Sequence, residues 1–191
     1  MEDMLGIEEK IYDYYSKEKM NIQEKIRQMS IKGQSDMEFK RINKEIKSLF
    51  SEYAIIDWTD EDSCCYELHI LLHEMQEILD DDIELITLLG GKREDLRIFF
   101  SVIDKYYYRF LERTEYNFSN KRWNFYTINN YSQKQEQLVK KLDNYMDMRK
   151  WIKITDSVAR TKIPNIETEL KYFGQATVFN CLFTDKIDIE G

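Results

Sequence analysis

Proline, glycine and long apolar runs are scarce in this chain. One proline and six glycines among 191 residues exclude collagen-like chains and flexible Gly- or Pro-rich linkers. The longest uninterrupted aliphatic runs are as short as residues 70–72, well under the roughly 18 apolar residues that a membrane-spanning helix needs. Residues 1–4 are acidic rather than basic, so they do not resemble the start of a secretory signal. These absences predict a cytoplasmic protein.

Cysteine and histidine are also rare. Cys64 and Cys65 are adjacent and Cys181 is alone, which is a poor disulfide framework and predicts reduced thiols. The two histidines, His69 and His73, follow Cys65 at four-residue steps, so a helix would carry all three on one face. Two histidines one helical turn apart can bind one metal ion, and zinc at His69 and His73 in a metal-dependent hydrolase is one hypothesis. The alternative is a pair of half-exposed histidines beside a leucine-rich core.

Most of the chain carries apolar residues at three- and four-residue steps, the spacing of amphipathic helices. The sequence therefore predicts a mainly α protein, a single-domain helical bundle of about six helices over residues 1–191. Its expected parts are a helical hairpin over 6–54, an acidic helical segment over 59–90, aromatic and basic helices over 92–160, and a C-terminal helix and strands over 165–190. In the last part, a strand-like stretch at 177–183 and an alternating stretch at 186–190 predict a small β-hairpin.

Local signals predict several helix ends. The capping-box pattern, in which a serine and a residue three positions later satisfy each other's backbone N–H groups, begins at Ser35 and again at Ser132. Acidic side chains favour a helix N-terminus, so residues 80–82 predict the start of a short helix. The Gly-Gly pair at residues 90–91 predicts its end.

Charge is unevenly distributed along the chain. The formal net charge is −8, and no lysine or arginine occurs between Lys47 and Lys92. Carboxylates crowded into this stretch would give one face a negative potential that repels nucleic acid and attracts a basic protein. The candidate protein-binding carboxylates are Asp57, Asp60, Glu61, Asp62, Glu77, Asp80, Asp81, Asp82 and Glu84. The alternative is a solvated face balanced by the basic residues of 96–165.

Aromatic residues are concentrated between Phe99 and Tyr131. Three successive tyrosines on a helix cover about 200° of its circumference, so at least one of residues 106–108 should lie near the surface. Exposed aromatics next to arginines are typical of protein-interface hot spots, and Tyr106, Tyr108 and Trp123 are candidate protein-binding residues. They are also typical of single-stranded nucleic-acid binding, here by residues 105–126, although the net charge argues against this. A tyrosine-rich core is the third interpretation.

No motif points to catalytic residues or to a cofactor other than the zinc alternative. A small, acidic, cytoplasmic chain without catalytic motifs resembles, in composition, bacterial immunity proteins and other inhibitors that neutralise a toxin. This resemblance implies a non-enzymatic protein that binds a cognate basic toxin or effector through its acidic and aromatic surface. A metal-dependent hydrolase and a single-stranded nucleic-acid-binding module are the alternatives.

Overall fold

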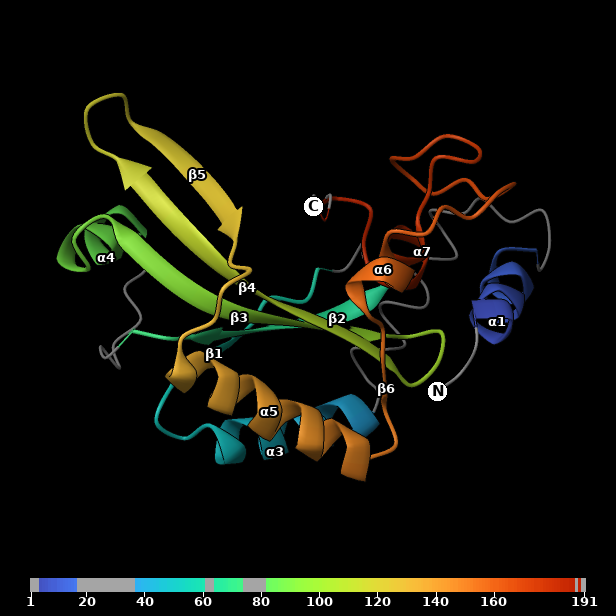
Figure 1. Cartoon of the computed structure of the whole chain (residues 1–191), viewed down its shortest axis with the longest axis horizontal. Coiled ribbons are helices and arrows are strands. Elements are labelled where there is room, and N and C mark those ends of the chain that lie inside the picture. Colours follow the sequence, from blue (N-terminus) through green and yellow to red (C-terminus); the bar gives the residue numbers. More distant parts are fainter. Residues whose placement is uncertain (1–3, 17–36, 61–63, 74–81, 188, 190–191) are drawn as a thin grey trace.

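The computed structural model describes residues 4–16, 37–60, 64–73, 82–187 and 189, which form a six-stranded mixed sheet with helices on both faces (Figure 1). The strands are β1 (Ala54–Asp57), β2 (Cys65–Leu71), β3 (Lys92–Ser101), β4 (Tyr106–Asn117), β5 (Arg122–Thr127) and β6 (Ile152–Lys153). The helices are α1 (Met4–Ser16), α3 (Met37–Leu49), α4 (Asp82–Leu88), α5 (Gln133–Met148), α6 (Asp156–Ala159) and α7 (Val178–Leu182). The prediction of a mainly α, all-helical bundle is therefore wrong, and the fold is of the α/β kind.

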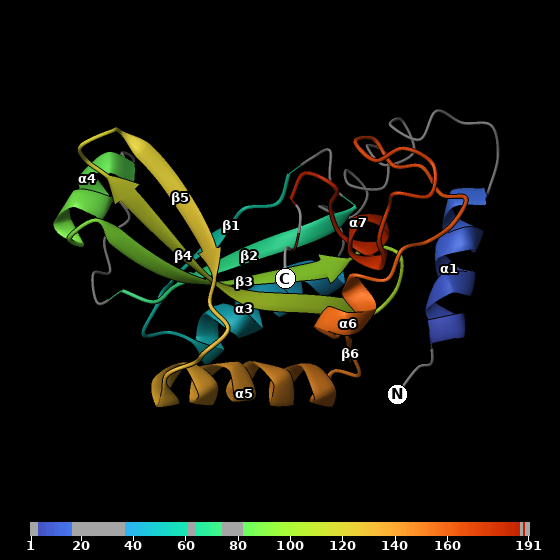
Figure 2. The ribbon, with the colours of Figure 1, turned by 45° about the horizontal axis from the view of Figure 1, so that its top comes forward.

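The outer edge of β4 changes its partner along the strand. β1 to β5 lie in chain order across the sheet, each antiparallel to the next. At one end of β4, residues 112–117 pair with β5, and at the other end residues 106–107 pair in parallel with β6. As a result the β4–β5 hairpin extends away from the body of the molecule, beside α4 (Figures 1 and 2).

The sheet has a hydrophobic core on each face. On one face α3 and α5 pack against strand residues such as Leu68 and Ile98. On the other face α1, α6 and α7 surround Phe99 and Tyr108. Because both faces are covered, every residue of β2 is buried, and the strand lacks the alternation of apolar and polar residues that marks a half-exposed strand.

Several helices follow their sequence signals. α5 begins at the predicted capping box, where the Ser132 side chain accepts from the Gln135 backbone N–H and the Gln135 side chain accepts from the Ser132 backbone. α4 begins at Asp82 and ends before Gly90, whose φ of 72° suits a residue without a Cβ. Ser35 lies outside the described residues. None of the described helices combines the length and the apolar character that crossing a bilayer would require.

Other parts of the helical prediction are wrong. The acidic segment contains strand β2, and the aromatic segment forms β3, β4 and β5 before α5 begins. The helical hairpin over 6–54 does not form, because Ile11 of α1 and Ile42 of α3 belong to cores on opposite faces of the sheet. The strand expected at 177–183 is helix α7, which starts at a capping box of Thr177 and Asn180, so the C-terminal β-hairpin is also wrong.

Candidate functional site

The β4–β5 hairpin extends away from the helices that cover the two faces of the sheet (Figure 2). It carries exposed aromatic side chains. Phe118, Phe125 and Tyr126 expose 51%, 62% and 50% of their surfaces. Trp123 is half-buried against Tyr116, and the two ring centroids are 4.6 Å apart. Large exposed apolar groups on a folded protein commonly mark a site of interaction with another molecule.

The outer edge of β5 is open, because in the described part of the chain this strand pairs with β4 alone. The Ile128 N–H donates to the Leu111 carbonyl at 2.8 Å, so by the alternation of the strand Trp123 and Phe125 direct their backbone groups away from β4. Proteins usually protect such an edge with charged residues or proline, and residues 123–127 contain neither. This uncharged aromatic run was present in the sequence, but its meaning depends on its position at the edge.

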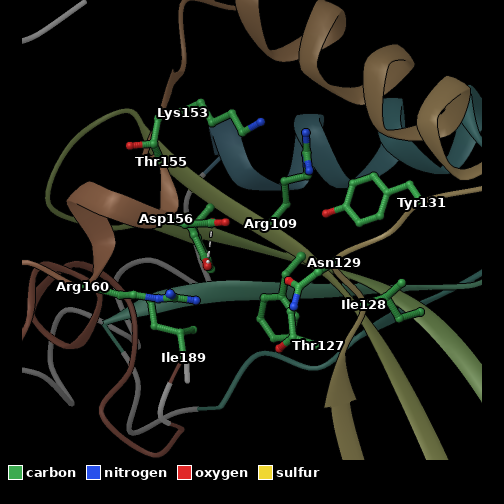
Figure 3. Close-up of a pocket in the computed structure, with 12 residues that line it drawn as sticks. Arg109, Thr127, Ile128, Asn129, Tyr131, Lys153, Thr155, Asp156, Arg160 and Ile189 are labelled. Carbon is green, nitrogen blue, oxygen red and sulfur yellow. Dashed lines mark hydrogen bonds between the residues drawn. The ribbon is translucent and has the colours of Figure 1, made fainter. Parts of the chain in front are cut away.

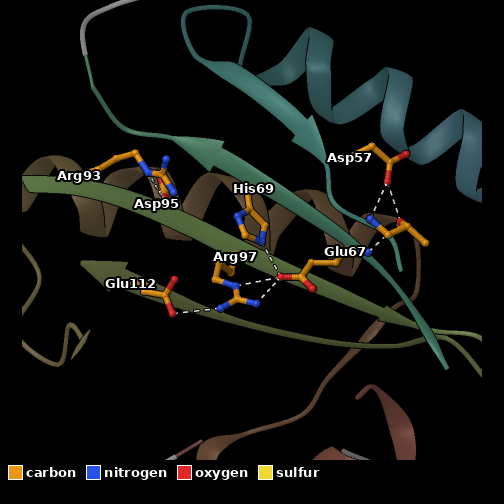
Figure 4. Close-up of polar contacts among 8 residues, drawn as sticks. Asp57, Glu67, His69, Arg93, Asp95, Arg97 and Glu112 are labelled. Carbon is orange, nitrogen blue, oxygen red and sulfur yellow. Dashed lines mark hydrogen bonds and ion pairs between the residues drawn. The ribbon is translucent and has the colours of Figure 1, made fainter. Parts of the chain in front are cut away.

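A charged cluster lies on the sheet face opposite α3 and α5 (Figure 4). The Arg97 Nε and Nη2 donate to Glu67 Oε1 at 2.9 and 2.5 Å, and its Nη1 donates to Glu112 Oε2 at 3.0 Å. His69 Nε2 lies 2.5 Å from the same Glu67 oxygen. Burial lowers the pKa of Arg97, but Glu67 and Glu112 outweigh this and raise it. The cluster therefore holds a guanidinium between two carboxylates, an arrangement that cross-links β2, β3 and β4.

Asp95 is the most buried carboxylate of this face, with no exposed surface. Its Oδ2 accepts from Arg93 Nε at 2.9 Å, whereas its Oδ1 has no hydrogen-bond partner among the described residues. Burial raises the pKa of Asp95, and the Arg93 charge opposes this rise only in part. A buried carboxylate oxygen without a hydrogen bond destabilises the folded chain, so other contacts must stabilise this part of the sheet.

The helical zinc site predicted at His69 and His73 does not form. His69 is a buried residue of strand β2, bonded to Glu67 and stacked on Trp58 with ring centroids 5.5 Å apart. His73 lies two residues beyond the end of the strand, so the two imidazoles do not share a helical face. Cys65 is likewise a buried strand residue. The described residues contain no group of three or more His, Cys, Asp or Glu side chains arranged to hold a metal ion.

The predicted acidic surface is only partly within the described residues. Asp60 forms an ion pair with Lys186 at 2.6 Å, and the exposed Asp57 accepts from Asn43 and Thr59. Glu84 is exposed on α4. Side chains outside the described residues are those of Glu61, Asp62, Glu77, Asp80, Asp81 and Asp82. The structure therefore shows Asp60 neutralised by Lys186, and the acidic patch as a whole stays a prediction.

The predicted aromatic site is divided by the fold. Tyr106, Tyr107 and Tyr108 are all buried, so the expectation that one of them is exposed is wrong. They are the first three residues of β4, where alternate side chains enter the two covered faces of the sheet. Burial raises the pKa of Tyr108, whose hydroxyl donates to Asp156 at 3.1 Å. Only Trp123 of the predicted aromatic residues lies in the exposed hairpin.

A polar cavity of about 200 Å³ lies beside β4, where the strand has left β6 and not yet met β5 (Figure 3). Residues from four separate segments line it, among them Arg109, Asn129, Lys153 and Arg160. No spacing in the sequence connects these residues, so sequence reasoning did not identify them.

Comparison of the chain with family models, with curated proteins and with solved structures gives no match. The arrangement of the described residues is therefore the basis for any functional proposal.

Proposed function

We propose that this chain is a non-enzymatic protein-binding module whose binding surface is the β4–β5 hairpin. The observation that carries the proposal is the combination, on one projecting hairpin, of three exposed aromatic side chains with an open strand edge. Aromatic side chains contribute most of the binding energy in many interfaces, and an open edge offers backbone hydrogen bonds to a partner strand.

The occupant that we propose is an extended segment of a partner protein, added antiparallel or parallel to β5. The edge supplies the backbone N–H and C=O groups of Trp123 and Phe125, which are directed away from β4. Lys121 and Arg122 are exposed at the start of β5, so acidic residues in the partner segment would match the hairpin in charge. The proposed binding surface is therefore aromatic and basic, whereas the sequence predicted an acidic one.

The biological role that we propose is inhibition of a toxin or effector, in the manner of an immunity protein, in the cytoplasm. This part of the proposal is supported by the composition of the chain and by its cysteines. The three cysteines are buried free thiols, which suits a reducing compartment. The basic partner predicted from the acidic segment is not required by the hairpin, and any partner that offers an acidic extended segment would serve.

A matched pair of substitutions tests the binding mode. A partner is first cross-linked and co-purified from the native host, identified, and its affinity for the chain measured by calorimetry. Phe125→Ala removes the ring and keeps the outward N–H, whereas Phe125→Pro removes both. We expect Phe125→Ala to weaken binding by about 30-fold, the effect of a hot-spot residue, and Phe125→Pro to weaken it further.

Tyr172→Ala is the control, because Tyr172 is 75% exposed on a loop far from the hairpin in sequence. It should leave the affinity unchanged. If the Ala and Pro variants bind equally weakly, the aromatic ring contributes to binding but the outward N–H does not. This result would support the aromatic surface and contradict strand addition. A partner that binds all three variants as tightly as the native chain would refute the proposed surface.

A further inference from the structure

Strand β1 forms the edge of the sheet opposite β5, and in the described part of the chain it pairs with β2 alone. The Trp58 N–H donates to the Glu67 carbonyl at 2.8 Å, so by the alternation of the strand the backbone groups of Ile55 and Asp57 are directed away from β2. Residues 54–58 contain no proline and no lysine, and Asp57 is their one charged residue. Among the described residues, the sheet therefore has two open edges, β1 and β5.

The two edges are opposite in charge. The exposed Asp57 of β1 accepts hydrogen bonds from Asn43 and Thr59, which are both neutral, so its negative charge is not balanced by these contacts. At the start of β5, Lys121 and Arg122 are exposed. An acidic β1 edge and a basic β5 edge attract each other, as complementary protein interfaces do.

We propose that β1 of one copy of this chain adds antiparallel to β5 of a second copy. In this register Ile55 lies opposite Phe125, which is 62% exposed. Asp57 lies opposite Trp123, so both pairs exchange the backbone hydrogen bonds that the two edges direct outward. Asp57 is then diagonal to Lys121, within reach of its long side chain, whereas parallel addition along the same residues would move Asp57 towards Phe125. The inference rests on the proposed function, because it names an occupant for the same β5 edge.

The same register also brings Trp58 opposite Arg122. Trp58 exposes 56% of its surface, and an arginine beside an exposed indole makes a favourable cation–π contact. The hairpin extends away from the helices that cover the sheet, which leaves its outer edge accessible to a second copy (Figure 2). Backbone, charged and aromatic groups of the two edges are therefore complementary in one alignment.

Each copy has one β1 edge and one β5 edge, so the contact is heterologous. Copies add head to tail, into an open chain or a closed ring. A contact between two short strands buries little surface, so we expect a dissociation constant of about 10–100 µM. The second copy would compete with any other acidic segment for the β5 edge.

Complementary edge variants test the contact. Ile55→Pro removes the outward N–H of β1, and Phe125→Pro removes that of β5. In sedimentation velocity, we expect the average mass of the native chain to rise between about 5 and 500 µM and each variant alone to stay monomeric. A mixture of the two variants should form a one-to-one dimer and nothing larger, because it contains one intact pair of edges. A native chain that is monomeric at about 500 µM, or association that persists in both variants, overturns the proposal.

Charge variants test the same register without proline, in case either proline variant fails to fold by circular dichroism. Asp57→Lys should weaken association by about tenfold, and Lys121→Glu added to the same chain should restore most of it. Asp147→Lys makes the same charge change at an exposed position of α5 and should change the affinity by less than about twofold. Equal weakening by Asp57→Lys and Asp147→Lys would show an effect of overall charge and would overturn the contact. The affinity of Phe125→Ala for a host partner is measured at about 1 µM, below the range of self-association, so failure of the proposed function is seen separately.

Discussion

The ion pair between Arg109 and Asp143 provides the sharpest test of how the sheet is attached to α5. Arg109 Nε and Nη2 donate to the two carboxylate oxygens of Asp143 at 3.0 and 2.6 Å, and the Tyr107 hydroxyl and Lys153 also donate to Asp143. The Arg109 side chain is 8% exposed and that of Asp143 is 25% exposed. Asp143→Asn therefore leaves a guanidinium almost fully buried without its counter-ion.

Removal of one partner from a fully buried pair costs about 3–5 kcal/mol. Because Asp143 keeps a quarter of its surface in solvent, we expect Asp143→Asn to lower the free energy of unfolding by about 2–3 kcal/mol at pH 7. Urea denaturation followed by tryptophan fluorescence measures this loss. Asp147→Asn, an exposed position one turn along the same helix, is the control and should change stability by less than about 0.5 kcal/mol.

The loss should depend on pH in a definite direction. Burial raises the pKa of Asp143, but the hydrogen bonds and charges of Arg109 and Lys153 outweigh burial and hold the pKa below its ordinary value. A carboxyl with a lower pKa in the folded chain stabilises the fold above its unfolded pKa of about 4, and the contribution is lost as the pH falls through the folded pKa. The difference between the native chain and Asp143→Asn should therefore be largest near neutral pH and shrink below about pH 4. A loss that is equal at pH 3 and pH 7 would refute this account.

Three further predictions concern other parts of the fold. Arg97→Met should lower the free energy of unfolding by about 3 kcal/mol, because Glu67 and Glu112 lose the cation that lies between them. Arg113→Met removes a more exposed ion pair and should lower it by less than about 1 kcal/mol. Urea denaturation measures both losses. Ser132→Ala should lower the free energy of unfolding by about 1 kcal/mol through loss of the α5 cap, and Ser132→Asp should retain most of it. Burial raises the pKa of Cys64 to about 12 and also raises that of Cys181, so a disulfide reagent at pH 8 should react with the thiols only after unfolding; rapid reaction of the native chain would contradict the burial of these thiols.

The helices that sequence reasoning identified are those that bury one face only. α5 buries Leu138, Leu142 and Met146 and exposes its other side, and its capping box is a local signal that needs no tertiary contact. α4 is fixed in the same way by its acidic start and its Gly-Gly end. In these segments the spacing of apolar residues in the sequence matches the positions that are buried in the structure.

Sequence reasoning missed β2, β3 and the first half of β4 because both faces of these strands are covered by other parts of the chain. In β3, Leu96 and Ile98 enter one core, while Phe99 enters the core on the opposite face, beside the buried Asp95 and the partly buried Arg97. In the sequence, these charged residues resemble the exposed face of a helix. In the structure, Asp95 pairs with Arg93 of the same strand and Arg97 pairs with Glu67 of β2. The usable signal was the run of aromatic residues at 106–108, which favours a strand.

The candidate sites show where sequence information ends. Composition identified the aromatic segment, but the same residue types are buried at Tyr106 and Tyr108 and exposed at Phe125 and Tyr126. What separates them is position: the first two lie in a strand with neighbours on both edges, and the others lie in the last strand of the sheet. Strand order is a long-range property, and a single sequence without homologues does not encode it in any local pattern.

The β4–β5 hairpin and the cavity beside β4 both arise from the length of β4. This strand of 12 residues pairs with β3 over residues 107–115, but its outer edge is divided between the six residues of β5 and the two of β6. The end that β5 covers extends past the helical layers and becomes the hairpin, and the part that neither strand covers becomes the cavity. Residues 127–129 connect the two, since they leave β5 and then line the cavity.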